Sequence, residues 1–574
     1  MTSSLDPGVA RRSCHWQNGR TFDRVAQALQ GCAAGKQGCF KEGFPVSESY
    51  SAPSDRLMPE SEQASQPPGG LPVEHWPVFI AGAGPAGLTA GYQLLKLNPA
   101  LRPFIAEAGK RVGGISRTEE HNGYRFDIGG HRFYTKLPEV EALWHEVLGD
   151  EFIRRPRLSR IYYRGRYYQY PLKAVNALSN LGLREAIHIL LSYAKWKVRP
   201  HKEEENLEQW VVNRFGGRLY WHFFRTYTEK VWGMPCTEIR ADWAAQRIKS
   251  LSLSKAVINA LTGHNTTVSL IDSFQYPRLG PGQMWEGFAD RIEEQGGEVR
   301  LRTRAVGFRR EGARIVEAEI EDENGERSIV RADHYLSTLP LPALIRSIDP
   351  PPPPAVMEAA DGLRFRDFLI VTLILDRADP FPDNWIYIHS PEVKVGRIQN
   401  FRAWSEAMVP DPDHASIGME YFCNVGDDLW DMTDEDLIAL ATRELAQLGL
   451  AEESTVLDGT IIRVPKAYPV YDADYLGHVN TIRDWLLTLD NLQSAGRNGM
   501  HRYNNQDHSM YAGMLAARNM DGGDHDIWNL NVERSYYEDF SVGRARLKAV
   551  DEQQGKDGGA DETPAPAKEE ALSS

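Results

Sequence analysis

Side chains that can bind and polarise a ligand are concentrated in residues 496–520, GRNGMHRYNNQDHSMYAGMLAARNM. Arginines, amides, a tyrosine, an aspartate and histidines come directly before a run of small residues. Buried polar groups without partners are costly, so a segment this polar is expected to bind something. The small residues predict a thin helix with Asn505 at its N-cap and Asp507 in its first turn. The positive end of that helix would stabilise negative charge on a bound molecule.

A strand, turn and helix near residue 80 is the element expected to position such a molecule. Residues 78–97, VFIAGAGPAGLTAGYQLLKL, run from an apolar strand through three spaced glycines into a helical pattern. Gly82 permits the tight turn, Gly84 lets the backbone approach a pyrophosphate, and Gly87 lets helix and strand pack closely. A second strand ends at Glu107, where an acidic side chain is expected to bind ribose hydroxyls. The motif predicts a dinucleotide site and leaves NAD and FAD both open.

The composition limits the partners and the compartment. The 574 residues are 42% apolar and carry a net charge of −14, which predicts a large globular core and argues against a nucleic-acid partner. The longest apolar run, 368–375, is far shorter than the roughly 20 residues of a transmembrane helix and predicts a buried strand. The five cysteines show neither a CxxC pair nor a metal-ligand spacing. We therefore expect no metal site and a reducing, cytoplasmic compartment.

Two further glycine segments carry a family resemblance. RVGGISRT (111–118) and FDIGGHRFY (126–134) resemble the second and third glycine segments of the large FAD family that includes amine oxidases, phytoene desaturases and UDP-galactopyranose mutases. The resemblance implies FAD as the cofactor. It also implies an α/β fold, in which a Rossmann-like FAD-binding domain carries inserted helical and mixed-sheet substrate domains. The FAD-binding residues that the motifs and the resemblance give are Gly82, Gly84, Pro85, Ala86, Gly87, Glu107, Gly114, Ser116, Gly129, Gly130, Arg497, Asn505 and Gln506.

Shifts in composition and the family pattern together predict seven consecutive regions. The two ends are rich in Ser, Gly, Pro and Gln or in charge, and lack apolar periodicity, so both are expected to be disordered. The predicted regions are a disordered N-terminal tail (1–72), a first FAD-binding segment (73–150), a helical substrate-binding insertion (151–270), a second FAD-binding segment (271–340), a mixed-sheet substrate domain (341–490), a C-terminal FAD-binding segment (491–545) and a disordered tail (546–574).

The resemblance is greatest to one branch, the UDP-galactopyranose mutases of the eukaryotic type. The carrying segments are GRNGMHRYNNQDHS, slightly shorter than its mutase counterpart, and YTEKVWGMPCTEIRADWAAQRI, NWIYIHSPEVKVGRIQNF and KAYPVY. By resemblance, two arginines bind a diphosphate, two tyrosines lie near its phosphates, and a histidine lies beside the reactive flavin nitrogen. These catalytic residues are Arg247, Arg397, Tyr468, Tyr503 and His131, and the implied substrate-binding residues are Tyr170, Trp232 and Tyr387.

The chemistry implied by the resemblance is a flavin-dependent isomerisation without net redox change. Reduced FAD, with NADPH or NADH as candidate reductants, would attack the anomeric carbon of a small-molecule nucleotide sugar, which would reclose as the furanose. One segment departs from the mutase pattern. YPLK, Tyr170 to Lys173, stands where the eukaryotic type has the uracil-binding Tyr-Pro-Phe-Gln, and Leu172 cannot stack on a base. The sugar and the nucleotide therefore stay open.

Two other functions also stay open. An oxidoreductase of the amine oxidase or desaturase type would oxidise an amine or a carbon–carbon bond and pass electrons to oxygen or a quinone. A non-catalytic flavoprotein would only bind partners. The paired arginines and tyrosines favour the mutase, because planar arginine donors suit a diphosphate and an amine or lipid substrate has no need of them. The sequence does not indicate an oligomeric state.

Overall fold

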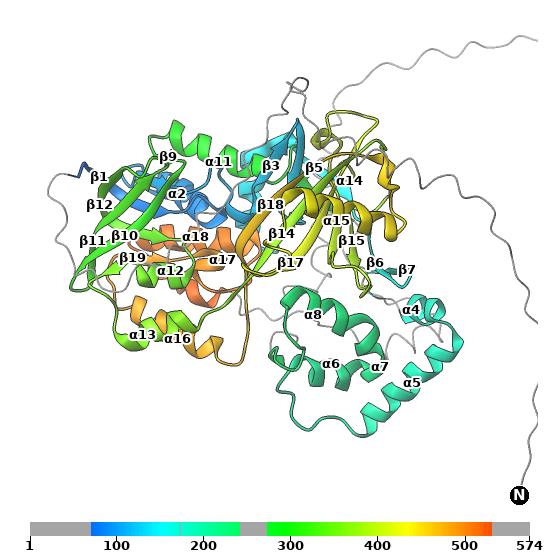
Figure 1. Ribbon diagram of the computed structural model, residues 1–574. Helices are drawn as coiled ribbons and strands as arrows, with labels where there is room; N and C mark the ends of the chain where they lie inside the picture. Colours follow the sequence, from blue (N-terminus) through cyan, green and yellow to red (C-terminus); the bar gives the residue numbers. More distant parts are fainter. Residues whose placement is uncertain (1–70, 171, 173, 242–272, 531–574) are drawn as a thin grey trace, which may run out of the picture. The chain divides into compact units, whose positions relative to one another are not determined.

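Two large β-sheets and the helices around them make up the portion of the chain that the structure describes (Figure 1). The computed structural model describes residues 71–170, 172, 174–241 and 273–530. Both predicted tails lie outside those residues, apart from positions 71 and 72, and the first strand begins at Val73. The mixed α/β architecture predicted from the sequence is confirmed.

The first sheet has a parallel centre and an antiparallel extension. Its strands, in spatial order, are β13 (Ile348–Asp349), β10 (Thr303–Glu311), β11 (Arg314–Asp322), β12 (Arg327–Ser337), β1 (Val73–Ala81), β2 (Pro103–Ala106) and β9 (Glu298–Arg300), with β19 (Leu492–Ser494) paired to β12. Ala81 of β1 lies level with Ala106 of β2 and with Ser337 of β12. Ser337 is also level with Ser494 of β19. The residues that follow these four strands therefore meet at one edge of the sheet.

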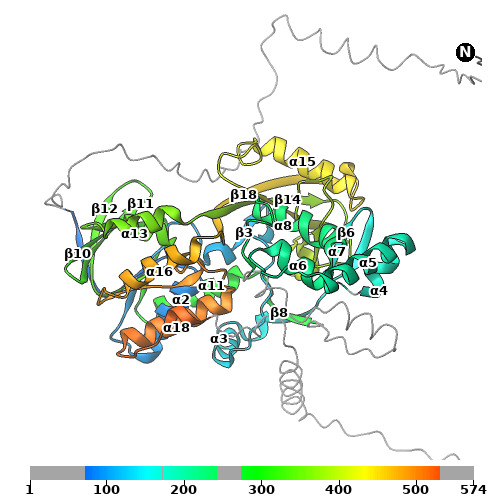
Figure 2. The same ribbon diagram turned by 90° about the horizontal axis from the view of Figure 1, so that it is seen from below.

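Helices from distant parts of the chain cover this sheet. They are α2 (Pro85–Leu97), α3 (Pro138–Leu148), α11 (Gly282–Glu294), α12 (Leu341–Arg346), α13 (Pro354–Gly362), α16 (Tyr475–Leu486), α17 (Gly496–Gly499) and α18 (Gln506–Met520). Figures 1 and 2 both place α18 beside α2, although more than 400 residues separate them in the sequence. Phe79, Phe104, Trp285 and Tyr335 are fully buried between sheet and helices.

The second sheet contains the strand predicted from the longest apolar run. Its order is β18 (Val456–Pro469), β14 (Phe365–Leu375), β17 (Ala415–Cys423), β16 (Arg397–Asn400), β15 (Trp385–Ile388), β6 (Ser159–Tyr163) and β7 (Arg166–Gln169). Every residue of β14 after Phe365 is buried, because strands pair on both sides and α15 (Asp434–Gln447) packs against the sheet. The strand prediction for 368–375 is confirmed.

The segment predicted as a helical insertion opens with strands, which corrects its predicted start. Before any helix come β6, β7 and β5 (Phe152–Pro156), which pairs with β8 (Ser273–Pro277). β6 also pairs with β15, so this portion of the chain belongs to the second sheet. The remaining short elements are β3 (Thr118–His121), β4 (Tyr124–Asp127), α14 (Phe401–Trp404), η1 (Gly114–Ser116), η2 (Gly149–Glu151), η4 (Glu406–Met408), η5 (Glu453–Thr455) and η6 (Ile527–Asn529).

The helices of the insertion have an apolar core of their own. They are α4 (Ala174–Leu181), α5 (Leu183–Val198), α6 (Leu207–Phe215), α7 (Gly217–Tyr220), η3 (Trp221–Arg225) and α8 (Thr226–Trp232). Val211, Leu219, Tyr220 and Phe223 are buried among them. Asn206 caps the start of α6, because its side chain accepts a hydrogen bond from the Gln209 backbone N–H at 3.0 Å. Figure 1 shows these helices together beside β6 and β7.

Candidate functional site

A cleft lies at the edge of the first sheet where its parallel strands end. Its volume is about 240 Å³. The turns that follow β1, β2 and β12 line it, and so do the loop before α18 and the first turn of that helix. The lining residues include Gly82, Gly84, Pro85, Ala86, Glu107, Gly114, Ser116, His131, Ala305, Thr338, Gly496, Arg497, Asn498, Asn504, Gln506 and Ser509. The aligned strand ends thus bring together residues that are hundreds of positions apart.

The three glycines of the first motif have distinct packing reasons. Gly82 has a φ of +104°, and a Cβ there would lie 2.2 Å from Thr338 Oγ1. A Cβ on Gly87 would lie 2.0 Å from the Gly82 carbonyl oxygen, so the helix can approach the strand only without one. A Cβ on Gly84 would meet only Gly114 Cα, at 3.9 Å. Gly84 therefore leaves the floor of the cleft open for close approach of a ligand.

Glu107 stands at the end of β2, as the motif predicts. Its Oε2 accepts a hydrogen bond from the Ala83 backbone N–H, and its Oε1 accepts one from the Gly109 N–H, both at 2.8 Å. Charge-assisted bonds of this kind hold the carboxylate at the mouth of the first turn. Glu107 is one of the residues that line the cleft after β2.

Helix α18 is held unusually close to α2. A Cβ on Gly513 would lie 2.2 Å from the Ala86 carbonyl oxygen, so the two backbones are in contact at this point. Asn505 occupies the predicted N-cap, but its side chain makes no capping hydrogen bond. The first backbone N–H groups of α18 have no helical partners, since no residue precedes them in the helix. Their positive end lies at the cleft, which Gln506 and Ser509 of this helix line.

Three residues that line the cleft have buried polar atoms without a hydrogen-bond partner in the described portion of the chain. They are Nδ1 of His131, Oδ1 of Asn498 and Oε1 of Gln506. Such atoms cost free energy unless something binds them. Burial, together with the positive charges of Arg497 and Arg397, lowers the pKa of His131 to about 3. His131 is therefore neutral at physiological pH. Its Nδ1 can form one hydrogen bond with a ligand.

Arg397 lies beside the third glycine segment and is held by Glu420. Its Nε donates to Glu420 Oε2 at 2.7 Å, and its Nη2 lies 2.5 Å from the same oxygen. A Cβ on Gly129 would lie 3.4 Å from Arg397 Nη2, so the guanidinium is next to the residues preceding His131. Burial opposes the charge on Arg397, but Glu420 and the nearby phenols raise its pKa well above the ordinary value. Arg397 is a fixed cation with one side already engaged.

Two of the predicted tyrosines stack on one another next to Arg497. The rings of Tyr468 and Tyr503 have centroids 5.6 Å apart and planes 19° apart. The Arg497 guanidinium lies 4.6 Å from the Tyr503 centroid, and its Nε donates to the Asn504 carbonyl at 2.9 Å. Burial raises the pKa of Tyr468, and so does the neighbouring Tyr503. Tyr468 therefore stays protonated, and Arg497 joins both rings to the loop that lines the cleft.

The predicted substrate-binding aromatics lie close together, with one exception. Tyr170 and Tyr387 have ring centroids 4.7 Å apart, and Tyr387 also meets Tyr227 edge to face at 5.7 Å. Trp232 is buried in the helical core and stacks on Tyr471, with centroids 6.4 Å apart. Trp232 packs against the same apolar cluster as Tyr387 without a described ring contact to it. These contacts are typical of a core aromatic residue.

Lys230 ties the helix of Trp232 to the loop between β15 and β16. Its Nζ lies 2.9 to 3.3 Å from the carbonyl oxygens of Ile388, Ser390, Val393 and Val395, which share its three N–H donors. Burial lowers the pKa of Lys230 to about 8. Four carbonyls around one ammonium group fix α8 relative to the strands that carry Tyr387 and Arg397.

Two predicted residues lie outside the described chain. Arg247 and Lys173 are not among the described residues, and Leu172 packs against the helical core as a half-buried side chain.

Sequence reasoning also missed two residues next to Arg397. Glu420 is the one charged residue in the buried strand ASIGMEYFC. A single charge in an apolar strand indicates a buried ion pair, and its partner is Arg397. Tyr227 stood within a quoted motif, but its position near Arg397 depends on tertiary packing.

A protein-family model matches most of the region that forms the cleft. The model of the family described as flavin containing amine oxidoreductase matches residues 85–518, which is well over half of the 574 residues. The chain belongs to this family. It is therefore a flavin-dependent enzyme with FAD as cofactor. The cleft fits that cofactor, because Gly84 leaves room for a pyrophosphate and the unpaired atoms of His131, Asn498 and Gln506 can bind its polar edge.

The curated relatives of this flavoenzyme match a limited segment. Coproporphyrinogen III oxidase of Mycobacterium leprae (strain TN) is 31% identical over 149 residues, which are 24% of this chain and 33% of that protein. Protoporphyrinogen oxidase 2, chloroplastic/mitochondrial, of Arabidopsis thaliana is 29% identical over 154 residues, 24% of this chain and 29% of that protein. The match thus spans about a third of the length of these relatives.

Solved structures resemble the flavoenzyme over most of its length. Reduced UDP-galactopyranose mutase superposes with a TM-score of 0.70 at 21% identity, covering 80% of this chain and 98% of that one. A putative protoporphyrinogen oxidase from Exiguobacterium sp. 255-15 gives 0.58 at 18% identity, covering 78% and 99%. Putrescine oxidase gives 0.53 at 17% identity, covering 79% and 100%. At these identities the likeness establishes the fold.

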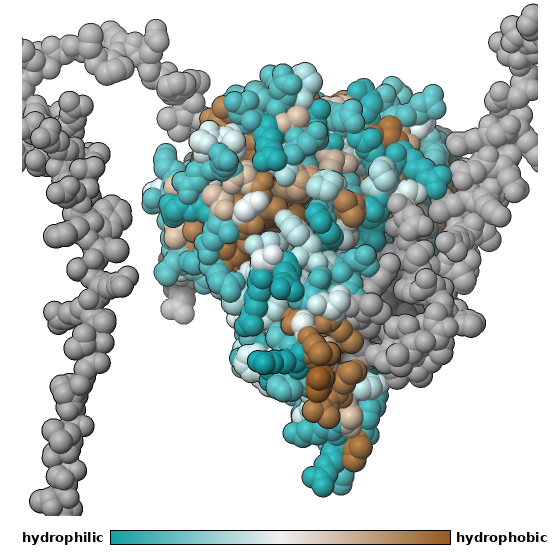
Figure 3. All heavy atoms as spheres, turned by 90° about the vertical axis from the view of Figure 1, so that its right-hand side faces the viewer, coloured by the Kyte–Doolittle hydropathy of each residue, from teal (hydrophilic) through white to brown (hydrophobic). Residues whose placement is uncertain are grey.

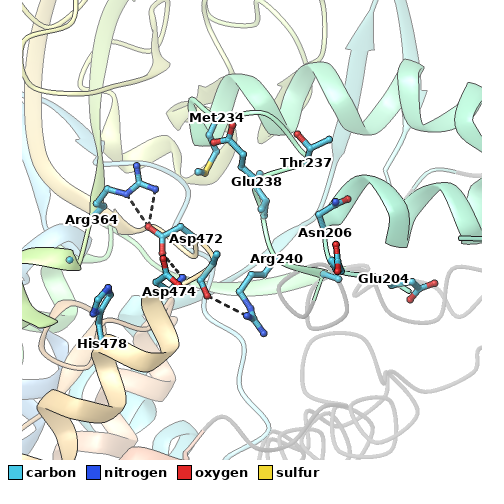
Figure 4. Close-up of a pocket in the computed structure, with 15 residues that line it drawn as sticks. Glu204, Asn206, Met234, Thr237, Glu238, Arg240, Arg364, Asp472, Asp474 and His478 are labelled. Carbon is cyan, nitrogen blue, oxygen red and sulfur yellow. Dashed lines mark hydrogen bonds and ion pairs between the residues drawn. The ribbon is translucent and has the colours of Figure 1, made fainter. Parts of the chain in front are cut away.

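A second cavity, of about 990 Å³, opens between the helical segment and the start of α16 (Figure 4). Glu204, Glu238 and Arg240 line one side, and Arg364 and Asp472 form an ion pair at 2.8 Å on the other. None of the predicted site residues lines it. No cluster of three or more metal-ligating side chains occurs among the residues that the structure describes.

Proposed function

We propose that this flavoenzyme is a nucleotide-sugar mutase that interconverts pyranose and furanose forms. The observation that carries the proposal is the convergence of Arg397, Tyr468, Tyr503 and Arg497 around the loops that precede His131 and α18. A clamp of permanent cations and protonated phenols suits a diphosphate leaving group. The resemblance in fold to a UDP-galactopyranose mutase supports the same function.

In this proposal each described side chain has a separate task. Bound FAD, in its reduced form, would supply the nucleophile for the anomeric carbon. Arg397 would stabilise the charge that develops on the departing diphosphate, and Glu420 would keep its guanidinium aligned before substrate arrives. The phenols of Tyr468 and Tyr503 would donate to phosphate oxygens, since burial keeps the pKa of Tyr468 above its ordinary value. The N-terminus of α18 would stabilise negative charge on the cofactor.

The decisive experiment is an assay of the reduced enzyme with a panel of substrates. Dithionite-reduced protein is incubated anaerobically with UDP-, dTDP- and GDP-pyranoses, and the furanose isomers are sought by chromatography. The proposal requires turnover only with reduced flavin and no net consumption of reductant. If no sugar isomerises, the mutase function is wrong. A preference for a dTDP- or GDP-sugar would assign the altered base recognition to the segment around Leu172.

Arg397 variants test the role of the clamp. Arg397→Ala is expected to lower kcat on the order of 100-fold or more, because an interaction that strengthens in the transition state is lost. Arg397→Lys should recover only a fraction of this loss, since an ammonium group lacks the two-pronged geometry. Arg160→Ala is the matched control: Arg160 also pairs with a fully buried carboxylate, Asp383, on the same sheet. Equal losses in both Ala variants would indicate general destabilisation and contradict the clamp.

An oxidoreductase is the second candidate, and the curated relatives favour it because both are named as oxidases of porphyrinogens. Glu420 also occupies one side of Arg397, which leaves fewer donors for a diphosphate. This candidate requires the opposite redox dependence. A substrate would bleach the oxidised flavin, and air or a quinone would restore its colour. Bleaching by a porphyrinogen, an amine or a polyene, with no isomerised sugar, would establish this candidate.

A further inference from the structure

Helix α5 presents an apolar stripe to solvent. Leu183 and Val198 are each 79% exposed, Leu191 is 63%, Ile187 48% and Leu190 41% exposed. At 3.6 residues per turn these positions fall within an arc about 100° wide on one side of the helix. The opposite side is anchored to the insertion through Ile189, which is fully buried. An exposed stripe of large aliphatic side chains is unusual for a surface helix and marks an interaction surface.

Basic residues border the stripe on both sides. Arg184 and Lys195 lie along one edge and Lys197 along the other, and Arg199 follows the end of the helix. The one acidic residue of α5, Glu185, faces inward and is neutralised by Arg218 and His222. This local positive charge contrasts with the net charge of −14 for the whole chain. The surface thus offers apolar side chains and positive charge together.

Aromatic residues sit beneath the charged edge. Tyr193 and Trp196 are half-buried, and the ammonium groups of Lys197 and Lys195 lie 5.3 Å and 5.4 Å from their respective ring centroids. Aromatic rings and long basic side chains of this kind are characteristic of helices that lie in a lipid–water interface. Figure 3 shows hydrophobic residues gathered on the lower portion of the face that contains this helix.

We propose that α5 is a docking surface for a membrane that contains anionic lipids. The leucines and Ile187 insert among the acyl chains, and the basic residues contact the head groups. In the described portion of the chain no helix is long and apolar enough to cross a bilayer, so the contact is peripheral. Charge decides between this occupant and a second copy, because two basic α5 surfaces facing one another across a symmetric interface would repel.

Vesicle sedimentation of the full-length holoenzyme tests the proposal. Vesicles of phosphatidylcholine with about one third phosphatidylglycerol should bind the protein, and vesicles of phosphatidylcholine alone should bind it far less. Ile187→Asp/Leu191→Asp should weaken binding about tenfold or more, because both membrane-inserted side chains become charged. Lys195→Glu/Lys197→Glu should weaken it too, and added salt should reproduce that effect in the parent protein.

The control carries the same change in charge elsewhere. Leu457→Asp/Leu487→Asp replaces two leucines that are 53% and 66% exposed outside α5, and it should bind vesicles like the parent. Flavin content and Tm of all variants show that they fold. Failure of the parent to bind anionic vesicles, or equal loss in the control, overturns the proposal. So does a dimer, seen by sedimentation velocity, that Ile187→Asp/Leu191→Asp disperses, because the stripe would then be an interface between copies.

Discussion

Asp127, the second residue of the third glycine segment, is a buried carboxyl group that is kept neutral. Its side chain is fully buried and accepts hydrogen bonds from the Tyr276 hydroxyl and from Thr118 Oγ1. Burial raises its pKa to about 8, although both hydrogen bonds act in the opposite direction. The neutral acid can donate as well as accept, which suits a position where strand β4 turns into the segment Gly129 to His131.

Asp127 should make the protein less stable at alkaline pH. A carboxyl whose folded pKa is raised stabilises the fold at low pH, and this contribution is lost as the pH rises toward about 8. Asp127→Asn has a neutral side chain of the same shape, so the Tm of the variant relative to the parent should rise between about pH 5 and about pH 9. Thermal unfolding followed by circular dichroism measures this difference. Parallel Tm curves for parent and variant would contradict the assignment, and Asp127→Ala controls for lost packing.

The glycines and Glu107 could be predicted from the sequence because local geometry dictates them. A positive φ or a backbone contact needs glycine whatever the distant chain does, as at Gly82 and Gly87. The ion pair of Arg397 with Glu420 could not be predicted in the same way. It joins neighbouring strands β16 and β17, where Arg397 lies level with Glu420, and that register is a tertiary property. The sequence signal was limited to one charge in an apolar strand.

At the scale of elements, the contact of α18 with α2 positions the cleft. The two helices approach so closely that the Gly513 backbone touches the Ala86 carbonyl, and the N-termini of both helices lie at the cleft. The run of small residues in 512–517 predicted a thin helix, and that is confirmed. Sequence reasoning missed the hairpin of β6 and β7, although its tyrosine-rich strands and the turn at Arg164 and Gly165, both with positive φ, are typical signals.

Enlarging Gly513 should separate the two helices and weaken cofactor binding. Gly513→Ala places a Cβ 2.2 Å from backbone oxygen, which cannot move like a side chain, and the cost should be about 1–3 kcal/mol. Flavin content after gel filtration and urea unfolding measure the two effects. Gly477→Ala is the matched control, because Gly477 is also helical and a Cβ there has nothing within 4 Å. That variant should be unchanged or more stable by up to about 1 kcal/mol. Equal behaviour of both variants would contradict the packing argument.

At the scale of the whole molecule, three buried histidines in separate loops make the fold less stable at acidic pH. Burial lowers the pKa of His131 and of His389 to about 3, and that of His501 to about 4. Each group is neutral in the fold and takes up a proton more readily when unfolded. The stability that they contribute is present above about pH 6.5 and is lost as the pH falls toward those folded pKa values.

Replacing one of these histidines should flatten the acid side of the stability profile. His389 stacks on Tyr227 with centroids 4.6 Å apart and planes 8° apart, so His389→Phe keeps an aromatic ring that cannot titrate. The Tm of His389→Phe relative to the parent should rise by a few degrees between about pH 6.5 and about pH 4. A Tm difference that stays constant over this range would show that His389 does not contribute.

The walls of the cleft come from both ends of the described chain. The turns after β1 and β2 are synthesised long before Arg497, Asn498 and Gln506. A nascent chain that has reached β18 holds the pyrophosphate turn but lacks the wall that α18 provides. Capture of the cofactor therefore has to wait until α18 has been made. Until then the β1–α2 unit has no partner for Ala86, and early release or truncation before Gly496 leaves a protein that cannot close around its flavin.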